Sequence, residues 1–177
     1  MSTPNGHFGF GQRATSEQIA GWDIDVAADG TGLPPGSGTV QQGEDLFARL
    51  GAGCHGANGE GGAAPPLAGG PQLVGGIGSL NTDQPVKTIG SYWPYAPTLF
   101  DYIRRAMPAD NPQSLTADEV YALCAYLLHL NGIVPADAVM DAQTLPQVVM
   151  PNHAGFTSPY PRPDVFGTAA PLPRTTA

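Results

Sequence analysis

The chain has 177 residues, 41% of them hydrophobic and 12% charged, a length that suits one domain or one small domain with long arms. Fifteen acidic residues face seven basic ones, and a surface with a formal net charge of -8 repels phosphate backbones, so we expect no nucleic-acid binding. No apolar run approaches the roughly 20 residues of a membrane-spanning helix. We therefore expect no membrane span, and with 24 glycines and 19 prolines the compact core should be smaller than the chain.

Residues 1–38 are predicted to form an N-terminal arm. A Ser or Thr can cap a short helical turn at residues 15–20, and the Gly- and Pro-rich residues 30–38 indicate a loop. The start of the chain has no basic region followed by an apolar stretch, so no signal peptide is visible. The protein is therefore expected either to stay in the cytoplasm or to be a mature exported form with an added starting Met.

The first strongly predicted helix covers residues 39–50. Apolar and small residues share one of its faces, at spacings of three and four positions: Val40, Gly43, Phe47 and Leu50. A glycine in mid-helix costs about 1 kcal/mol relative to alanine. Gly43 therefore indicates that another backbone approaches this face closely.

Two further helices are predicted after a long loop. Residues 56–97 are rich in Gly and Pro, and a loop this long would be unusual in a compact domain unless it packed on a large apolar ligand. Residues 98–106 follow Pro97 and are predicted to form a short helix. Residues 116–131 form the strongest helix, opened by a capping box of Thr116 and Glu119, with an apolar stripe that includes Cys124.

The segment 51–56, GAGCHG, carries the chemistry. A c-type haem site uses Cys-x-x-Cys-His, in which two thiols bond the haem vinyl groups and the histidine binds iron. Cys54 and His55 supply the second thiol and the histidine, whereas Gly51 stands in the place of the first thiol. The motif predicts haem c held by a single thioether at Cys54, with His55 as an iron ligand; it leaves open whether the haem is singly bonded, held noncovalently or absent.

With this motif and its neighbours, residues 39–133 resemble class I cytochromes c. The resemblance implies an all-α fold around one haem, in which the first and last helices cross at Phe47 and Tyr126 while Gly43 allows their approach. We accordingly expect a cytochrome domain at residues 39–134 and a Pro-rich C-terminal extension at 135–177. The sequence predicts that this extension is either disordered or laid along a partner.

The same resemblance implies further haem-binding residues. Met107 falls at the position of the second iron ligand. Pro65 falls where the family has a proline whose carbonyl accepts the imidazole N–H of the haem histidine, with Leu67 close by. Trp93 and Tyr95 are expected either to wall the haem or to pack in the core. Cys124 is expected to be a packed thiol, and a disulfide between Cys54 and Cys124 is the alternative.

A closer resemblance extends over nearly the whole chain. Residues 19–26, 32–38, 91–96 and 111–116 look like the cytochrome subunit of sulfite and sulfur dehydrogenases of the SoxD type. This resemblance implies a periplasmic complex in which a molybdenum-cofactor dehydrogenase subunit oxidises a sulfur species. The haem subunit would pass the electrons to an electron-acceptor cytochrome. Some members have two haems, but one Cys-His pair predicts one haem here.

Three functions compete at this point. The first is outer-sphere electron transfer by a haem subunit that is no enzyme by itself. The second is a haem-less structural subunit that has kept the cytochrome fold, which the missing first thiol favours. An independent sulfur-oxidising enzyme is disfavoured, because the sequence shows no nucleophile–base pair and no multi-ligand catalytic metal site.

Overall fold

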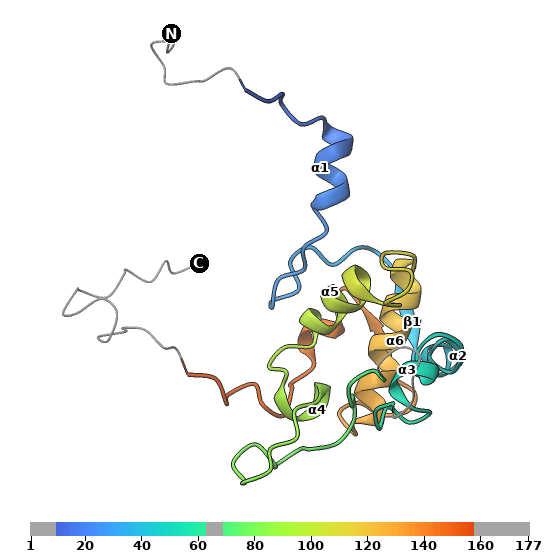
Figure 1. Cartoon of the computed structure of the whole chain (residues 1–177), viewed down its shortest axis with the longest axis vertical. Helices are drawn as coiled ribbons and strands as arrows, with labels where there is room; N and C mark the ends of the chain where they lie inside the picture. Colours follow the sequence, from blue (N-terminus) through green and yellow to red (C-terminus); the bar gives the residue numbers. More distant parts are fainter. Residues whose placement is uncertain (1–9, 63–68, 158–177) are drawn as a thin grey trace, which may run out of the picture.

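The computed structural model describes residues 10–62 and 69–157, and its architecture is mostly helical. The elements in chain order are α1 Ser16–Trp22, β1 Ser37–Thr39, α2 Val40–Leu50, α3 Ala52–His55, α4 Ile89–Tyr92, α5 Pro97–Ala106, α6 Ala117–Leu130, β2 Val139–Asp141 and the 3-10 turn η1 Leu145–Gln147 (Figure 1). Within the described part the only sheet is the short antiparallel pair β1–β2. The predicted all-α class is therefore confirmed, and each predicted helix is present within two residues of its expected ends.

Helices α2 and α6 cross in close contact. A Cβ atom on Gly43 would lie 1.9 Å from the carbonyl oxygen of Ala122, so only glycine allows this approach. One helical turn further on, the rings of Phe47 and Tyr126 lie with their centroids 5.5 Å apart. The expected crossing of the two helices, and the role of Gly43 in it, are confirmed.

Helix α6 is the centre of the core. It lies between α2 on one side and α5 on the other (Figure 1), and every residue from Val120 to Leu128 is buried. A single apolar stripe, as the sequence predicted, would leave one face in water. The helix is instead enclosed on all sides, because the strands β1 and β2 cover the face that neither α2 nor α5 reaches.

The C-terminal segment up to residue 157 belongs to this packed body. Strand β2 pairs with β1 in the register Gly38 to Met140. Met140, Leu145 and Met150 are buried in the core cluster. The packed core thus continues beyond the boundary predicted at residue 134. The proline-rich segment after that boundary contributes apolar side chains to the core, although they are widely spaced in the sequence. Residues 158–177 lie outside the described part of the chain.

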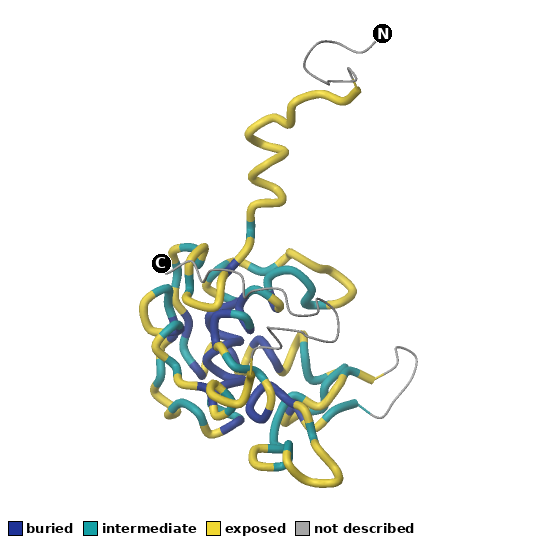
Figure 2. The backbone as a smooth tube through the Cα atoms, turned by 90° about the vertical axis from the view of Figure 1, so that its left-hand side faces the viewer, coloured by how far each residue is buried: buried dark blue, intermediate teal, exposed yellow. Residues whose placement is uncertain are grey.

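The N-terminal arm also has one part that packs on the core and one part that does not. Val26 is buried, and the Tyr121 hydroxyl donates a hydrogen bond to the carbonyl of Pro34, so the chain from about residue 25 packs on the core. Helix α1, in contrast, has no buried residue and stands away from the body (Figure 2). Its N-terminus is closed by a capping box of Thr15 and Gln18.

None of the helices in residues 10–62 and 69–157 has the length and apolar character needed to cross a bilayer.

Candidate haem site

The short helix α3 presents Cys54 and His55 next to each other. It begins where α2 ends: Gly51 donates its N–H to the Phe47 carbonyl at 2.8 Å, and its own carbonyl accepts the N–H of His55 at 2.9 Å. Gly56, with φ of +82°, ends the helix in a conformation that favours glycine. Both functional side chains are half-buried, so they are held by the fold and are still reachable by a ligand.

The orientation of the His55 ring is set by a hydrogen bond from its Nδ1 to the carbonyl oxygen of Pro71, 2.9 Å away. A carbonyl oxygen only accepts, so Nδ1 carries a proton, and in the neutral ring Nε2 is then the nitrogen with a free lone pair. The loop that brings Pro71 here is fastened by the N–H of Gly70, which donates to the Cys54 carbonyl at 2.7 Å. This is the arrangement that orients a histidine ligand and raises its basicity.

The acceptor of this hydrogen bond corrects the sequence prediction, which gave the role to Pro65. The structure gives it to Pro71, six positions later, while Pro65 and Leu67 lie outside the described residues. Gly70 lets the loop come this close, because a Cβ there would lie 2.6 Å from the His55 ring atoms Nδ1 and Cε1. Two positions after Pro71, Leu73 packs on the core and holds this part of the loop in place.

The space beside Gly51 is filled by the ring of Phe47. A Cβ atom at position 51 would lie 2.5 Å from Cδ2 and 2.6 Å from Cε2 of that ring. The ring is only 3% exposed and packs on Tyr126, so it has little room to move away. A side chain at position 51 would therefore require the buried Phe47 ring to move.

The long loop after the haem motif is held to α6 by the buried side chain of Asn131. Its Nδ2 donates to the carbonyls of Leu73 and Leu127, and its Oδ1 accepts the N–H of Gly75. Further along, the Thr88 hydroxyl donates to the Gly75 carbonyl at 2.6 Å. The described part of the loop is thus ordered by polar contacts with the core.

Met107 follows directly on helix α5. Its N–H donates to the Ile103 carbonyl at 3.0 Å, and its side chain is half-buried against the core cluster. The helix is anchored by a buried inner face, on which the ring of Phe100 lies 4.5 Å from that of Tyr121. A thioether at the end of a firmly packed helix is a soft, uncharged donor of the kind that binds haem iron.

The outer side of α5 carries a group of linked charges. Arg105 donates its Nε–H to both carboxylate oxygens of Asp101 at 2.9 Å, and its terminal nitrogen contacts Asp25 in the arm. Asp101 also accepts the N–H of Val26 at 2.9 Å. The hydrogen bond to Asp101, and then that to Asp25, raise the pKa of Arg105, so the cation stays charged at any working pH.

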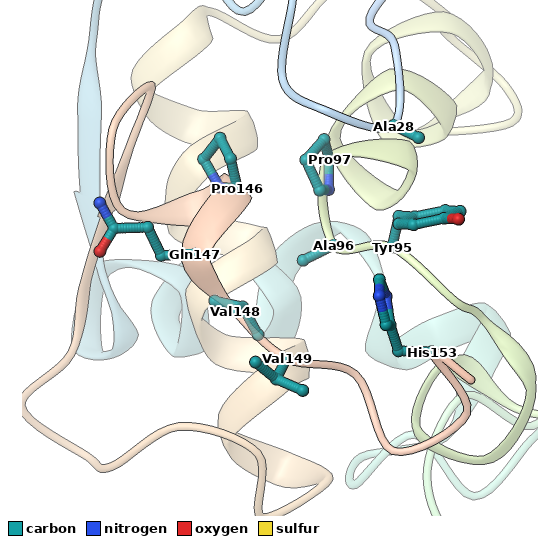
Figure 3. A pocket seen from close by; sticks show the side chains of 9 residues that line it. All are labelled: Ala28, Tyr95, Ala96, Pro97, Pro146, Gln147, Val148, Val149 and His153. Carbon is teal, nitrogen blue, oxygen red and sulfur yellow. The ribbon is translucent and has the colours of Figure 1, made fainter. Parts of the chain in front are cut away.

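Trp93 and Tyr95 have aromatic partners of their own. The ring of Trp93 meets the ring of Tyr102 edge-on at 5.7 Å, and that of Tyr95 meets His153 at 5.2 Å. Tyr95 and His153 line a pocket of about 100 Å³ together with Ala28 and Pro146 (Figure 3). None of Cys54, His55 and Met107 lines this pocket, which is far smaller than the roughly 300 Å³ of a typical ligand site.

Cys54 and Cys124 are not bonded to each other. Both are free thiols, and Cys124 is completely buried in α6, so the predicted packed thiol is confirmed and the alternative disulfide is wrong. Burial raises the pKa of the Cys124 thiol above its ordinary value, which makes it unreactive near neutral pH. Cys54 is therefore the reactive thiol of the pair, next to the oriented imidazole.

Comparison with known proteins identifies the family of the chain. The family model for cytochrome c matches residues 40–131. The whole fold is similar to a chain in the crystal structure of the sulfane dehydrogenase SoxCD from Paracoccus pantotrophus, with 42% sequence identity and a TM-score of 0.79 over 97% of this chain and 83% of that chain. No curated protein sequence matches the chain.

Proposed function

Because this chain belongs to the cytochrome c family, we propose that it is the haem subunit of a periplasmic sulfur-compound dehydrogenase. In this proposal a molybdenum-cofactor subunit oxidises the sulfur compound, and this chain takes the electrons and passes them to an acceptor cytochrome. The chain is an electron-transfer protein and not itself a catalyst. The 42% identity to a chain of a sulfane dehydrogenase supports the choice of a sulfur compound.

The observation that carries the proposal is the hydrogen bond from His55 to Pro71, 2.9 Å long. It fixes the direction of a half-buried imidazole and places the proton of the neutral ring on Nδ1, so that Nε2 would be the atom to bind haem iron. We assign His55 and Met107 as the two iron ligands and Cys54 as the covalent anchor. When bound, the haem supplies a metal that changes its charge by one electron without making or breaking bonds in the protein.

We propose a single thioether because of the contact between Gly51 and Phe47. A second thioether needs a side chain at position 51, where the buried Phe47 ring would lie 2.5 Å from its Cβ. Iron ligation does not use this position. A haem held by Cys54, His55 and Met107 is therefore compatible with the packing, and one haem agrees with the one Cys-His pair in the sequence.

Helix α1 and the chain before it are the surface that we propose for the molybdenum subunit. Phe10, Ile19 and Trp22 are exposed by 91%, 53% and 87%, although they are large and apolar. Exposed apolar groups on one projecting segment are typical of an interface. The similarity to the chain of the sulfane dehydrogenase includes the arm, since it extends over 97% of this chain.

Reduced-minus-oxidised spectroscopy of the protein produced with haem-attachment machinery tests the proposal. A pyridine haemochrome band between those of two-thioether and free haem is the expected result. His55→Ala should abolish the low-spin spectrum, whereas the matched change His153→Ala, at a histidine that lies against Tyr95, should leave it intact. Absence of any haem band would instead establish the alternative function, a structural subunit.

Reduction of the haem by the molybdenum subunit tests the proposed partner and its docking surface. The molybdenum subunit, supplied with a reduced sulfur compound, should reduce the haem of this chain. Trp22→Ala should slow that reduction without changing the haem spectrum, because Trp22 lies in the projecting helix. Equal rates of reduction for the unchanged protein and Trp22→Ala would show that the molybdenum subunit docks at another surface.

A further inference from the structure

We propose that Asp101 is a positioning residue for Met107, and that through Arg105 it ties this iron ligand to the base of the N-terminal arm. The inference rests on the proposed function, because it assumes that Met107 binds haem iron. It adds a physical connection between the N-terminal segment that we assign to the partner and Met107, the thioether that would bind the haem iron.

The connection begins within helix α5. Asp101 and Arg105 are four residues apart, and the two 2.9 Å contacts of Arg105 Nε with the carboxylate fix the last turn of the helix. Met107 follows Arg105 by two positions and continues the helix through its own N–H bond to Ile103. Any shift of this last turn therefore moves the sulfur of Met107.

The inner and outer faces of α5 are held differently. Leu99, Phe100 and Ile103 are buried and fix the inner face. The outer face is held by charges, with the side chains of Arg105 and Asp101 35% and 26% exposed. Partly exposed ion pairs are weak on their own. Here one Nε–H of Arg105 is shared by both oxygens of Asp101, and the same carboxylate accepts a backbone N–H, which gives the pair a defined geometry.

The arm is attached to the same two side chains. Asp101 accepts the backbone N–H of Val26 at 2.9 Å, and Arg105 contacts the carboxylate of Asp25. Asp25 lies three residues after the end of α1 at Trp22, and its side chain is 81% exposed. A partner that pulls on α1 therefore acts first on Asp25 and Val26, and through them on the turn of α5 that precedes Met107.

Competition by added imidazole for the ferric holoprotein measures how firmly Met107 is held. Asp101→Asn should raise the affinity for imidazole about fivefold, the scale expected for losing a partly exposed charge pair. Arg105→Lys should act in the same direction, because lysine keeps the charge but has no second nitrogen with which to contact Asp101 and Asp25 from the two ends of a planar group. The control Asp45→Asn, which removes an exposed carboxylate from α2, should have no effect.

The midpoint potential separates positioning from simple electrostatics. Removal of a negative charge alone favours the ferrous state and raises the potential, whereas loosening of the thioether lowers it. We expect a lower potential and a weaker methionine-to-iron absorption band in Asp101→Asn. An unchanged imidazole affinity, or a raised potential with the band intact, would overturn the inference while leaving the proposed function in place.

Asp25→Asn tests the part that concerns the arm. It should raise the imidazole affinity in the same direction as Asp101→Asn but by less, because it breaks only the contact with Arg105. Imidazole affinity equal to that of the unchanged protein would refute the connection to the arm. A protein that holds no haem, by contrast, would overturn both this inference and the proposed function.

Discussion

The imidazole of His55 and the carbonyl of Pro71 are joined by a 2.9 Å hydrogen bond across sixteen positions of sequence. The bond connects the helix that carries the haem motif to the loop that follows it. Because Gly70 also donates its N–H to the Cys54 carbonyl at 2.7 Å, the loop and the motif form one unit around the ring. The direction of the proposed iron ligand thus depends on backbone groups of the loop.

Gly70→Ala is expected to disturb this unit. The new methyl group would lie 2.6 Å from Nδ1 and Cε1 of His55, so the ring or the loop has to move and the Pro71 hydrogen bond lengthens. We expect a higher midpoint potential, because an imidazole that loses this hydrogen bond is a less basic ligand and stabilises the ferric state less. The control is Gly21→Ala, at a helical glycine with open space around it. Identical spectra and potentials for both variants would contradict the assigned role of the loop.

Gly51→Ala is expected to destabilise the fold by about 1–3 kcal/mol, the usual cost of forcing an extra carbon into a packed site. Its Cβ would lie 2.5 Å from the buried Phe47 ring, whereas a Cβ on Gly53, two positions away, would meet nothing within 4 Å. Gly53→Ala should therefore be neutral in urea unfolding. If both variants unfold at the same urea concentration, Phe47 does not close the position.

The attachment of the haem can be read from the reactivity of the two cysteines. Cys124 is buried and its raised pKa protects it in the native state, so only Cys54 can react with iodoacetamide near neutral pH. With a thioether at Cys54, mass spectrometry should find no adduct in the native protein and one after denaturation. The variant Cys124→Ala should then show none in either state. A second adduct after denaturation would mean that the haem is not covalently bound.

Leu145→Ala tests whether the C-terminal segment belongs to the cooperative core. Leu145 is fully buried, and its truncation should cost about 2–5 kcal/mol of unfolding free energy. Val149 is 78% exposed in the same segment, so Val149→Ala should change the stability by less than about 0.5 kcal/mol. Thermal unfolding followed by circular dichroism measures both. A small effect for Leu145→Ala would show that the segment is dispensable for the fold.

Local patterns in the sequence were sufficient for the helices and for the haem motif. The capping residues Thr39 and Thr116 begin α2 and α6, and Gly43 and Phe47 indicated the face on which these helices cross. Cys54 and His55 are adjacent in sequence, so their placement on one short helix required no knowledge of the fold. Such features depend on interactions between residues a few positions apart.

The acceptor of the His55 hydrogen bond and the extent of the core were decided by the tertiary structure. Pro65 and Pro71 both follow the motif within one loop, and only the folded path of that loop brings the carbonyl of Pro71 to the ring. Met140, Leu145 and Met150 show no helical or strand period, and they are buried because α6 leaves a face that they can cover. The sequence by itself thus determined which groups this protein has for holding a haem. Contacts between distant segments decided which backbone atoms orient those groups and where the core ends. Local sequence patterns do not contain the energies of such contacts.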